Sequence, residues 1–137
     1  MNPRIYISQS DVNRLNRLLD SPQLLRGTDP SMLDKLKREL ARAVIVPNSE
    51  LPDTVITLNS TVELENLTDK EVDQYTLVWP DQANIDEGKI SILAPLGVGM
   101  IGFKVGDKFK WETPAGTVTF RVLKVSKNGV PLPQSKG

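Results

Sequence analysis

The sequence contains neither cysteine nor histidine. Without cysteine the chain can form no disulfide and no thiolate metal site. Without histidine it lacks the side chain best suited to proton transfer near neutral pH, which is also the commonest metal ligand. These two absences exclude a Ser-His-Asp triad, a Cys-His pair and a zinc site. The composition therefore favours a protein that is not an enzyme and that binds no metal or other cofactor.

Aromatic residues and long apolar runs are also scarce. Aromatics make up 5% of the 137 residues, and no run of Lys or Arg is interleaved with them, so direct nucleic-acid binding has little support. No apolar run approaches the roughly 18 residues that span a bilayer. The first residues, Met1 to Arg4, are not followed by the apolar core of a signal peptide. We therefore expect a cytoplasmic protein that does not contact a membrane.

Acidic and basic residues are equal in number, 17 of each, but they are unevenly distributed. Residues 1–46 carry a net charge of +3, residues 47–103 one of −8, and residues 104–137 one of +5. Such asymmetry can steer association with a charged partner. Alternatively, acidic and basic strands lie side by side in one sheet and pair across it. The sequence leaves both interpretations open, because the strand order decides between them.

Two amphipathic helices are predicted in the N-terminal part. The first begins after Ser8, a good N-cap, and ends near Asp20. The second begins at Asp29-Pro30, since Asp caps free N–H groups and Pro suits the first helical position, and its apolar stripe continues through Val44. Because a short loop joins the helices, we expect an antiparallel helical hairpin whose apolar faces pack on each other.

A linker with two prolines, residues 47–54, separates this hairpin (residues 1–46) from a β-rich unit (residues 55–137). Alternation of apolar and polar residues predicts strands in that unit. The predicted strands cover residues 55–58, 61–65, 72–79, 90–93, 108–113 and 118–125. With one short helix at residues 96–101, the fold class is α+β, and we expect the β-rich unit to have a core of its own.

The most informative stretch is residues 90–111, ISILAPLGVGMIGFKVGDKFKW. A short strand is broken at Ala94-Pro95, because proline cannot donate to a sheet. A small-residue helical turn follows, then a tight turn in which Gly106 is free to take a positive φ, then a second strand. This order closely resembles the C-terminal domain of the bacterial transcript-cleavage factors, the GreA/GreB family. With a shortened helical hairpin in front of it, the chain is similar to the branch of that family named for the regulation of nucleoside diphosphate kinase.

The resemblance implies a fold, a partner and a contact. The fold would be FKBP-like, a twisted antiparallel sheet curled around a short helix. The partner would be RNA polymerase, where the family's C-terminal domain docks on a coiled coil of the largest subunit at the rim of the secondary channel. The docking loop would correspond to Leu93, Ala94, Pro95 and Leu96. We assign Ala94-Pro95 to the contact and Leu93 and Leu96 to the core; GreB-type factors carry Asp and Ser in place of Leu93 and Ala94.

The hairpin itself offers a second possible contact. Its basic side chains are expected to add salt-sensitive affinity for the acidic mouth of the channel. They are Arg14, Arg17, Lys35, Lys37, Arg38 and Arg42.

In the cleavage factors, acidic residues at the tip of a long coiled coil hold a magnesium ion. Here each helix is too short to bring the tip to the polymerase active centre, and Asp20 and Asp29 are explained by their places at helix ends. We therefore predict a monomeric regulator of transcription elongation that competes with cleavage factors, cleaves no RNA, and meets nucleic acid only through the polymerase. The alternatives are a truncated cleavage factor, an FKBP-like prolyl isomerase, and a generic protein-interaction domain.

Overall fold

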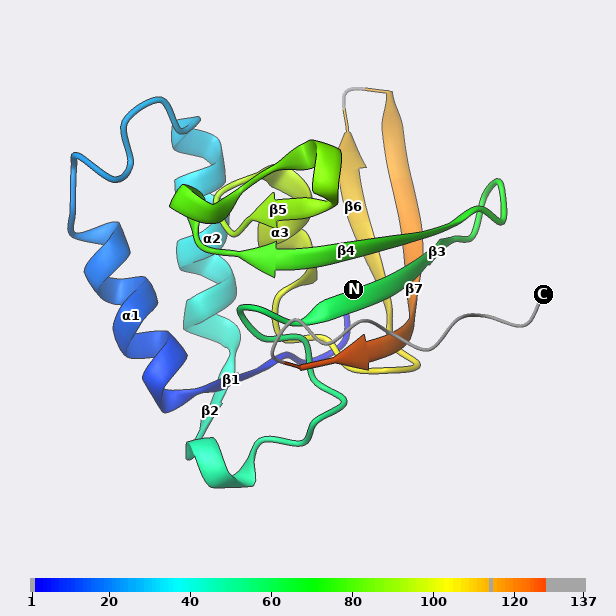
Figure 1. The fold of residues 1–137 in the computed structure, drawn as a ribbon, viewed down its shortest axis with the longest axis horizontal. Coiled ribbons are helices and arrows are strands. Elements are labelled where there is room, and N and C mark those ends of the chain that lie inside the picture. Colours follow the sequence, from blue (N-terminus) through cyan, green and yellow to red (C-terminus); the bar gives the residue numbers. More distant parts are fainter. Residues whose placement is uncertain (1, 114, 128–137) are drawn as a thin grey trace.

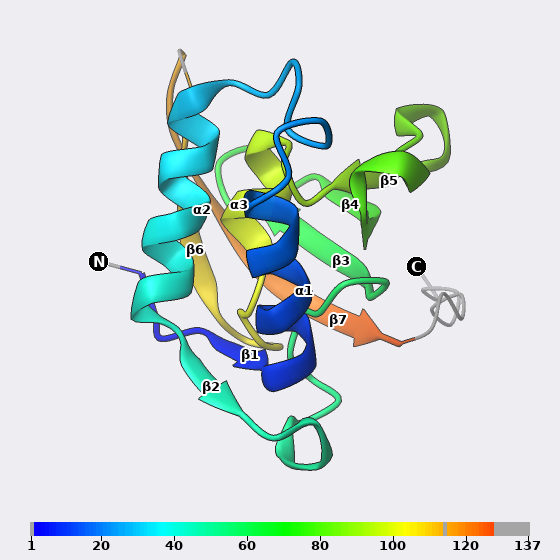
Figure 2. The same ribbon diagram turned by 90° about the vertical axis from the view of Figure 1, so that its left-hand side faces the viewer.

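The computed structural model describes residues 2–113 and 115–127. Helix α1 (Gln9–Leu19) and helix α2 (Pro30–Arg42) lie side by side and run in opposite directions at one end of a five-stranded sheet (Figures 1 and 2). A short helix, α3 (Pro95–Met100), contacts α2 on one side and strands of the sheet on the other. In the part of the chain that the structure describes, no helix is long and apolar enough to cross a membrane.

The sheet has the strand order β5-β4-β3-β7-β6. Its strands are β3 (Thr61–Asn66), β4 (Val72–Val78), β5 (Lys89–Ser91), β6 (Lys108–Thr113) and β7 (Gly116–Ser126). The expectation of a wholly antiparallel sheet is wrong at one edge, because β5 runs parallel to β4. Two 3-10 turns between these strands (Pro80–Gln82 and Ile85–Glu87) carry the chain back, so that β5 begins opposite Thr76 and runs beside the second half of β4.

The strand order decides between the two interpretations of the charge distribution. Acidic β3 lies beside basic β7, with Glu63 opposite Lys124 and Glu65 opposite Arg121. Arg121 and Glu65 approach to 4.0 Å between side-chain nitrogen and oxygen. Between β3 and β7, acidic and basic residues of the segregated segments therefore stand opposite one another.

A second, two-stranded sheet joins the two ends of the helical pair. Strand β1 (Tyr6–Ser8) pairs in parallel with β2 (Val44–Val46). The prediction that the second helix extends through Val44 is wrong: α2 ends at Arg42, and the β-branched run of β2 pairs with the N-terminal segment instead. Pairing with β1, which is far away in the sequence, makes this segment a strand.

The strand predicted at residues 55–58 is also not formed. Val55 makes only an isolated bridge with Lys104. Ile56 exchanges backbone hydrogen bonds with residues 102–103, donating to the carbonyl of Phe103 at 2.8 Å and accepting from the N–H of Gly102 at 3.0 Å. The chain then turns, with Asn59 at a φ of 70°. These apolar residues are therefore buried by tertiary contacts, although the segment is not a strand.

One hydrophobic cluster connects the helices with the sheet. Ile5 and Ile7 of the N-terminal segment, Leu15 of α1 and Leu36 of α2 are all fully buried in it. On the sheet side, the largest buried members include Ile92, Met100, Phe103 and Phe109. The expectation that the helices pack only on each other is therefore wrong, because they share one cluster with the sheet.

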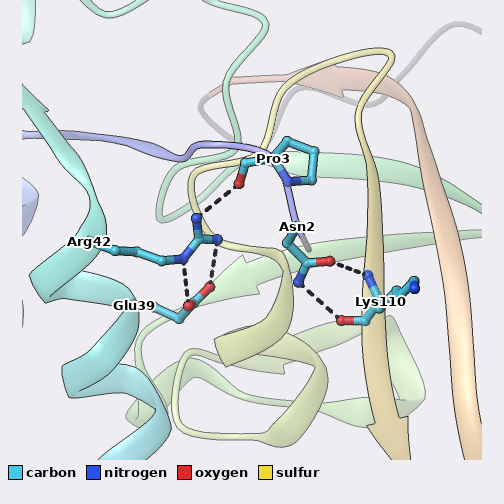
Figure 3. A network of polar contacts seen from close by, with 5 residues as sticks. All are labelled: Asn2, Pro3, Glu39, Arg42 and Lys110. Atoms are coloured by element: carbon cyan, nitrogen blue, oxygen red, sulfur yellow. Dashed lines mark hydrogen bonds and ion pairs between the residues drawn. The ribbon is translucent and has the colours of Figure 1, made fainter.

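Polar contacts fasten the N-terminal segment to both sides of this core (Figure 3). The side-chain amide of Asn2 pairs with the backbone of Lys110 on edge strand β6, accepting at 2.8 Å and donating at 3.3 Å. Arg42, at the end of α2, donates to the carbonyl of Pro3 at 2.9 Å and to the carboxylate of Glu39. Asn2 thus occupies the open edge of β6 as a strand partner would.

Candidate partner-binding surface

The predicted docking loop leaves the sheet at the end of β5. Backbone and side-chain oxygens of Ser91 shape it: Ser91 Oγ accepts from the N–H of Leu93, and the Ser91 carbonyl accepts from the N–H of Ala94, each at 3.0 Å. Pro95 then stands at the first position of α3, where a missing N–H costs nothing. The loop is therefore held in one shape before any partner arrives.

Exposure divides the four loop residues. Leu93 is only 8% exposed and belongs to the core, as the sequence predicted. Ala94 and Leu96 are partly buried and pack against that core, and Pro95 is exposed. Pro95, with parts of Ala94 and Leu96, forms the surface of the loop.

Gly97 permits this geometry. A Cβ atom at this position would lie 2.0 Å from the carbonyl oxygen of Ser91, so only glycine allows α3 to approach the end of β5 so closely. At Gly99, the corresponding atom would meet the ring of Trp111 at 3.2 Å. The small residues of this motif are explained by close packing of the helix.

A groove of about 290 Å³ lies between α1, the α1–α2 loop and the end of β4. Its lining residues are Arg14, Arg17, Leu18, Leu24, Trp79, Pro80 and Asp81. The guanidinium carbon of Arg14 lies 4.2 Å from the centre of the Trp79 ring, a cation–π contact. Trp79 is 9% exposed, whereas Leu24 is 58% exposed.

Docking loop and groove lie at the same end of the sheet. In the parallel pair of β4 and β5, Val78 is the register partner of Ser91. The residues that follow, Trp79-Pro80 on one strand and the docking loop on the other, therefore leave the sheet together, on the side of α1 and α2 (Figure 1). Arg14 and Arg17, two of the predicted partner-binding residues, line the groove at this end of the sheet.

The other predicted basic residues lie elsewhere, so the helical pair does not present a single basic face. Lys37 lines a different groove, between α1 and α2. Arg42 is engaged by Glu39 and Pro3. Lys35 is half-buried and Arg38 exposed on α2, and neither lines the groove beside Trp79.

The two aspartates considered for a metal have structural places. Asp29 caps α2, accepting from the N–H and the hydroxyl of Ser31, each at 2.9 Å. These hydrogen bonds lower the pKa of Asp29. Asp20 follows the last residue of α1, and its own N–H donates to the carbonyl of Asn16. Within residues 2–113 and 115–127, no three acidic side chains gather where a metal ion could be held.

A polar pocket at the N-terminal end of α1 has Lys127 in its wall. The ammonium of Lys127 donates to the carbonyl oxygen of Val55 and, at 3.2 Å each, to the hydroxyl oxygens of Thr57 and Ser60. Burial lowers the pKa of Lys127, and burial also raises the pKa of Asp11 in the same pocket. Three acceptors use the three N–H donors of the lysine, so this arrangement ties the end of β7 to the turn before β3.

Sequence reasoning named none of Leu24, Trp79 and Pro80 as a partner-binding residue. One signal was available: Leu24 and Leu25 stand in a loop that is otherwise polar, and an apolar pair in a surface loop needs either burial or a partner. Leu25 packs on the core, and Leu24 does not.

Comparison with known proteins gives the family. The family model described as "Transcription elongation factor, GreA/GreB, C-term" matches residues 51–127, which include the docking loop and α3. The chain belongs to the GreA/GreB family. A second family model, "Rnk N-terminus", matches residues 3–46 of this GreA/GreB chain, so the two matches divide it at the predicted linker.

Relatives of the chain are named as a regulator of nucleoside diphosphate kinase or as transcription elongation factors. The "Regulator of nucleoside diphosphate kinase" of Escherichia coli K12 is 37% identical over 117 residues, which are 85% of this chain and 84% of that protein. GreA of Christiangramia forsetii is 32% identical over 110 residues, 80% of this chain and 70% of the other. A solved GreA/GreB structure from Nitrosomonas europaea is 38% identical with a TM-score of 0.71, covering 90% of this chain and 98% of that one.

Proposed function

We propose that this protein binds RNA polymerase at the rim of the secondary channel, through the docking loop, and regulates transcription elongation without cleaving RNA. The observation that carries the proposal is the shape of the loop, with Pro95 exposed on a turn fixed by Ser91. A rigid apolar knob loses little entropy on binding and fits a groove between two helices. The family match over residues 51–127 supports the same partner.

Helix length supports the regulatory part of the proposal. The helices α1 and α2 have 11 and 13 residues, so they are about 16 and 20 Å long at 1.5 Å per residue. With the docking loop on the rim, such helices end far from the polymerase active centre. The protein would therefore occupy the site of a cleavage factor and compete with it, as a monomer in the cytoplasm that meets nucleic acid only within the complex.

Two finer parts of the proposal rest on resemblance alone. The FKBP-like description of the sheet comes from the family's fold. Regulation of nucleoside diphosphate kinase comes from the name of the Escherichia coli relative. No side chain described above argues for contact with that kinase.

The test is binding to core RNA polymerase by the purified protein. Pro95→Asp should weaken binding about tenfold or more, because it puts a charge and a more flexible backbone into an apolar contact. Ala94→Asp added to it should weaken binding further. The matched control is Pro52→Asp, because Pro52 is also exposed but lies outside the docking loop. This variant should bind polymerase like the parent. If a folded double variant binds as tightly as the parent, the loop is not the contact.

A second assay separates a regulator from a cleavage factor. Backtracked polymerase given this protein and magnesium should release no additional cleaved RNA, and the protein should slow cleavage stimulated by a cleavage factor added alongside it. RNA cleavage that the protein stimulates, and that Asp20→Asn abolishes, would contradict the proposal.

A further inference from the structure

The groove beside Trp79 combines an apolar floor with a cationic rim. Its apolar lining consists of Leu18, Trp79, Pro80 and Leu24, and Leu24 is the exposed member on the α1–α2 loop. Arg14 and Arg17 extend from α1 over the same space. Because Arg14 stacks on the Trp79 ring at 4.2 Å, its guanidinium is held in place before any ligand arrives, which reduces the entropy lost on binding.

The charges on the rim have no carboxylate partner at contact distance. Among residues 2–113 and 115–127, the ion pairs within 4.0 Å involve other cations than Arg14 and Arg17. The charge of Arg14 acts at longer range on Asp11, where it favours the ionised carboxylate. Asp81, at the other end of the groove, is the one acidic residue in its lining. Two arginines with free donors are suited to bind carboxylates in a bidentate manner.

We propose that this groove binds an acidic segment of the protein partner, one that packs an apolar side chain on the exposed Leu24 and places carboxylates on Arg14 and Arg17. The inference rests on the proposed function, because the parallel pair of β4 and β5 brings the groove and the docking loop to one end of the sheet. A partner that covers this end of the sheet would contact both. Pro95 gives the rigid contact and the two arginines give selectivity for an acidic surface.

The charge pattern and the burial of Trp79 favour a protein over a nucleic acid. Stacking of a base requires an accessible aromatic face, whereas Trp79 is 9% exposed and Arg14 covers its ring. The exposed apolar atoms belong to Leu24, an aliphatic residue that suits another aliphatic or aromatic side chain. A second copy of this chain could also supply carboxylates, and the test distinguishes it.

The experiment measures the affinity of the full-length protein for core RNA polymerase at two salt concentrations. Leu24→Glu should weaken binding about tenfold, because it introduces an acid where an apolar side chain and carboxylates arrive. Arg17→Glu should weaken it by a similar factor and reduce the salt dependence of binding. Each has a matched control outside the groove: Ile85→Glu, at a side chain that is 73% exposed, and Arg26→Glu, on the same loop as Leu24. Both controls should stay within about twofold of the parent.

Each outcome decides a different point. If the parent does not bind polymerase, the proposed function fails and this inference fails with it. If Pro95→Asp weakens binding while folded Leu24→Glu and Arg17→Glu bind like the parent, the function stands and the groove is not part of the contact. Equal losses in the groove variants and their controls would show a general charge effect and overturn the inference. So would concentration-dependent dimers of the parent that Leu24→Glu abolishes, or binding of single-stranded RNA that Arg17→Glu abolishes.

Discussion

At the scale of single residues, one glycine determines whether the docking loop can form. Gly97 lies in α3, where an alanine would ordinarily be favoured over glycine by about 1 kcal/mol. Here the methyl group would overlap the carbonyl oxygen of Ser91 at 2.0 Å. That carbonyl also accepts from the N–H of Ala94, so it cannot move without opening the loop. Packing therefore overrides helix propensity at this position.

Gly97→Ala should consequently destabilise the protein by about 3 kcal/mol or more. The control is Gly27→Ala, at a glycine with a φ of +82° and no atom within 4 Å of the added methyl group. It should cost only the strain of a left-handed residue, about 1–2 kcal/mol. Urea unfolding followed by tryptophan fluorescence measures both. Equal losses would show that overlap with Ser91 is not the cause.

At the scale of elements, the sequence predicted best where local chemistry decides. Ser8 and Asp29-Pro30 mark the starts of α1 and α2, and Pro95 marks the start of α3, because capping and the missing N–H of proline act within a few residues. Prediction failed where a distant partner decides. The sequence of β2 predicts the end of a helix, and only the pairing with β1 makes it a strand.

The start of α2 gives a prediction that also separates a cap from a metal ligand. The hydrogen bonds from Ser31 lower the pKa of Asp29 below its ordinary value of 3.8. Its ionised form therefore stabilises the folded state above pH 3.8, and this stabilisation is lost as the pH falls through the lower pKa of the folded state. Asp29→Asn keeps an acceptor for the cap, so it should be slightly less stable than the parent at neutral pH and equal to it in acid.

Thermal unfolding of the parent and of Asp29→Asn between pH 2 and pH 7 measures this difference. Asp29→Ala, which lacks the acceptor, should be less stable than the parent at every pH. A stability of the parent that rises with added magnesium, and that Asp29→Asn removes, would contradict the assignment of Asp29 as a cap.

At the scale of the whole molecule, the two family matches divide the chain into two parts, whereas the hydrophobic core includes residues of both parts. The matches change over near residue 50, in agreement with the linker that the prolines predict. The core does not change over there, because Ile5 and Leu36 are buried in the same cluster as Phe103. Gly102, whose N–H binds the carbonyl of Ile56 and whose carbonyl accepts from Tyr6, connects the two sides. Periodicity shows which residues of an element are buried, but not which other element covers them.

Residues 48–137 alone should therefore fail to fold, although they include the whole five-stranded sheet. Removing residues 1–47 takes away four fully buried side chains, Ile5, Ile7, Leu15 and Leu36. Each contributes about 1.5–3 kcal/mol of burial, so the loss is comparable to the whole stability of a typical domain, about 5–15 kcal/mol. A full-length protein whose backbone is cleaved once, within the exposed residues 52–54, keeps all four of these buried side chains. Its two pieces should stay together and folded.

Near-ultraviolet circular dichroism and polymerase binding of the fragment, the cut protein and the parent measure the difference. The cut protein should match the parent in both, while the fragment should show no fixed tertiary packing and no binding. A fragment that folds and binds polymerase like the parent would show that the sheet carries its own core. In the expected case the helices serve the docking loop as part of its support, because α2 packs on α3 and α3 begins at Pro95.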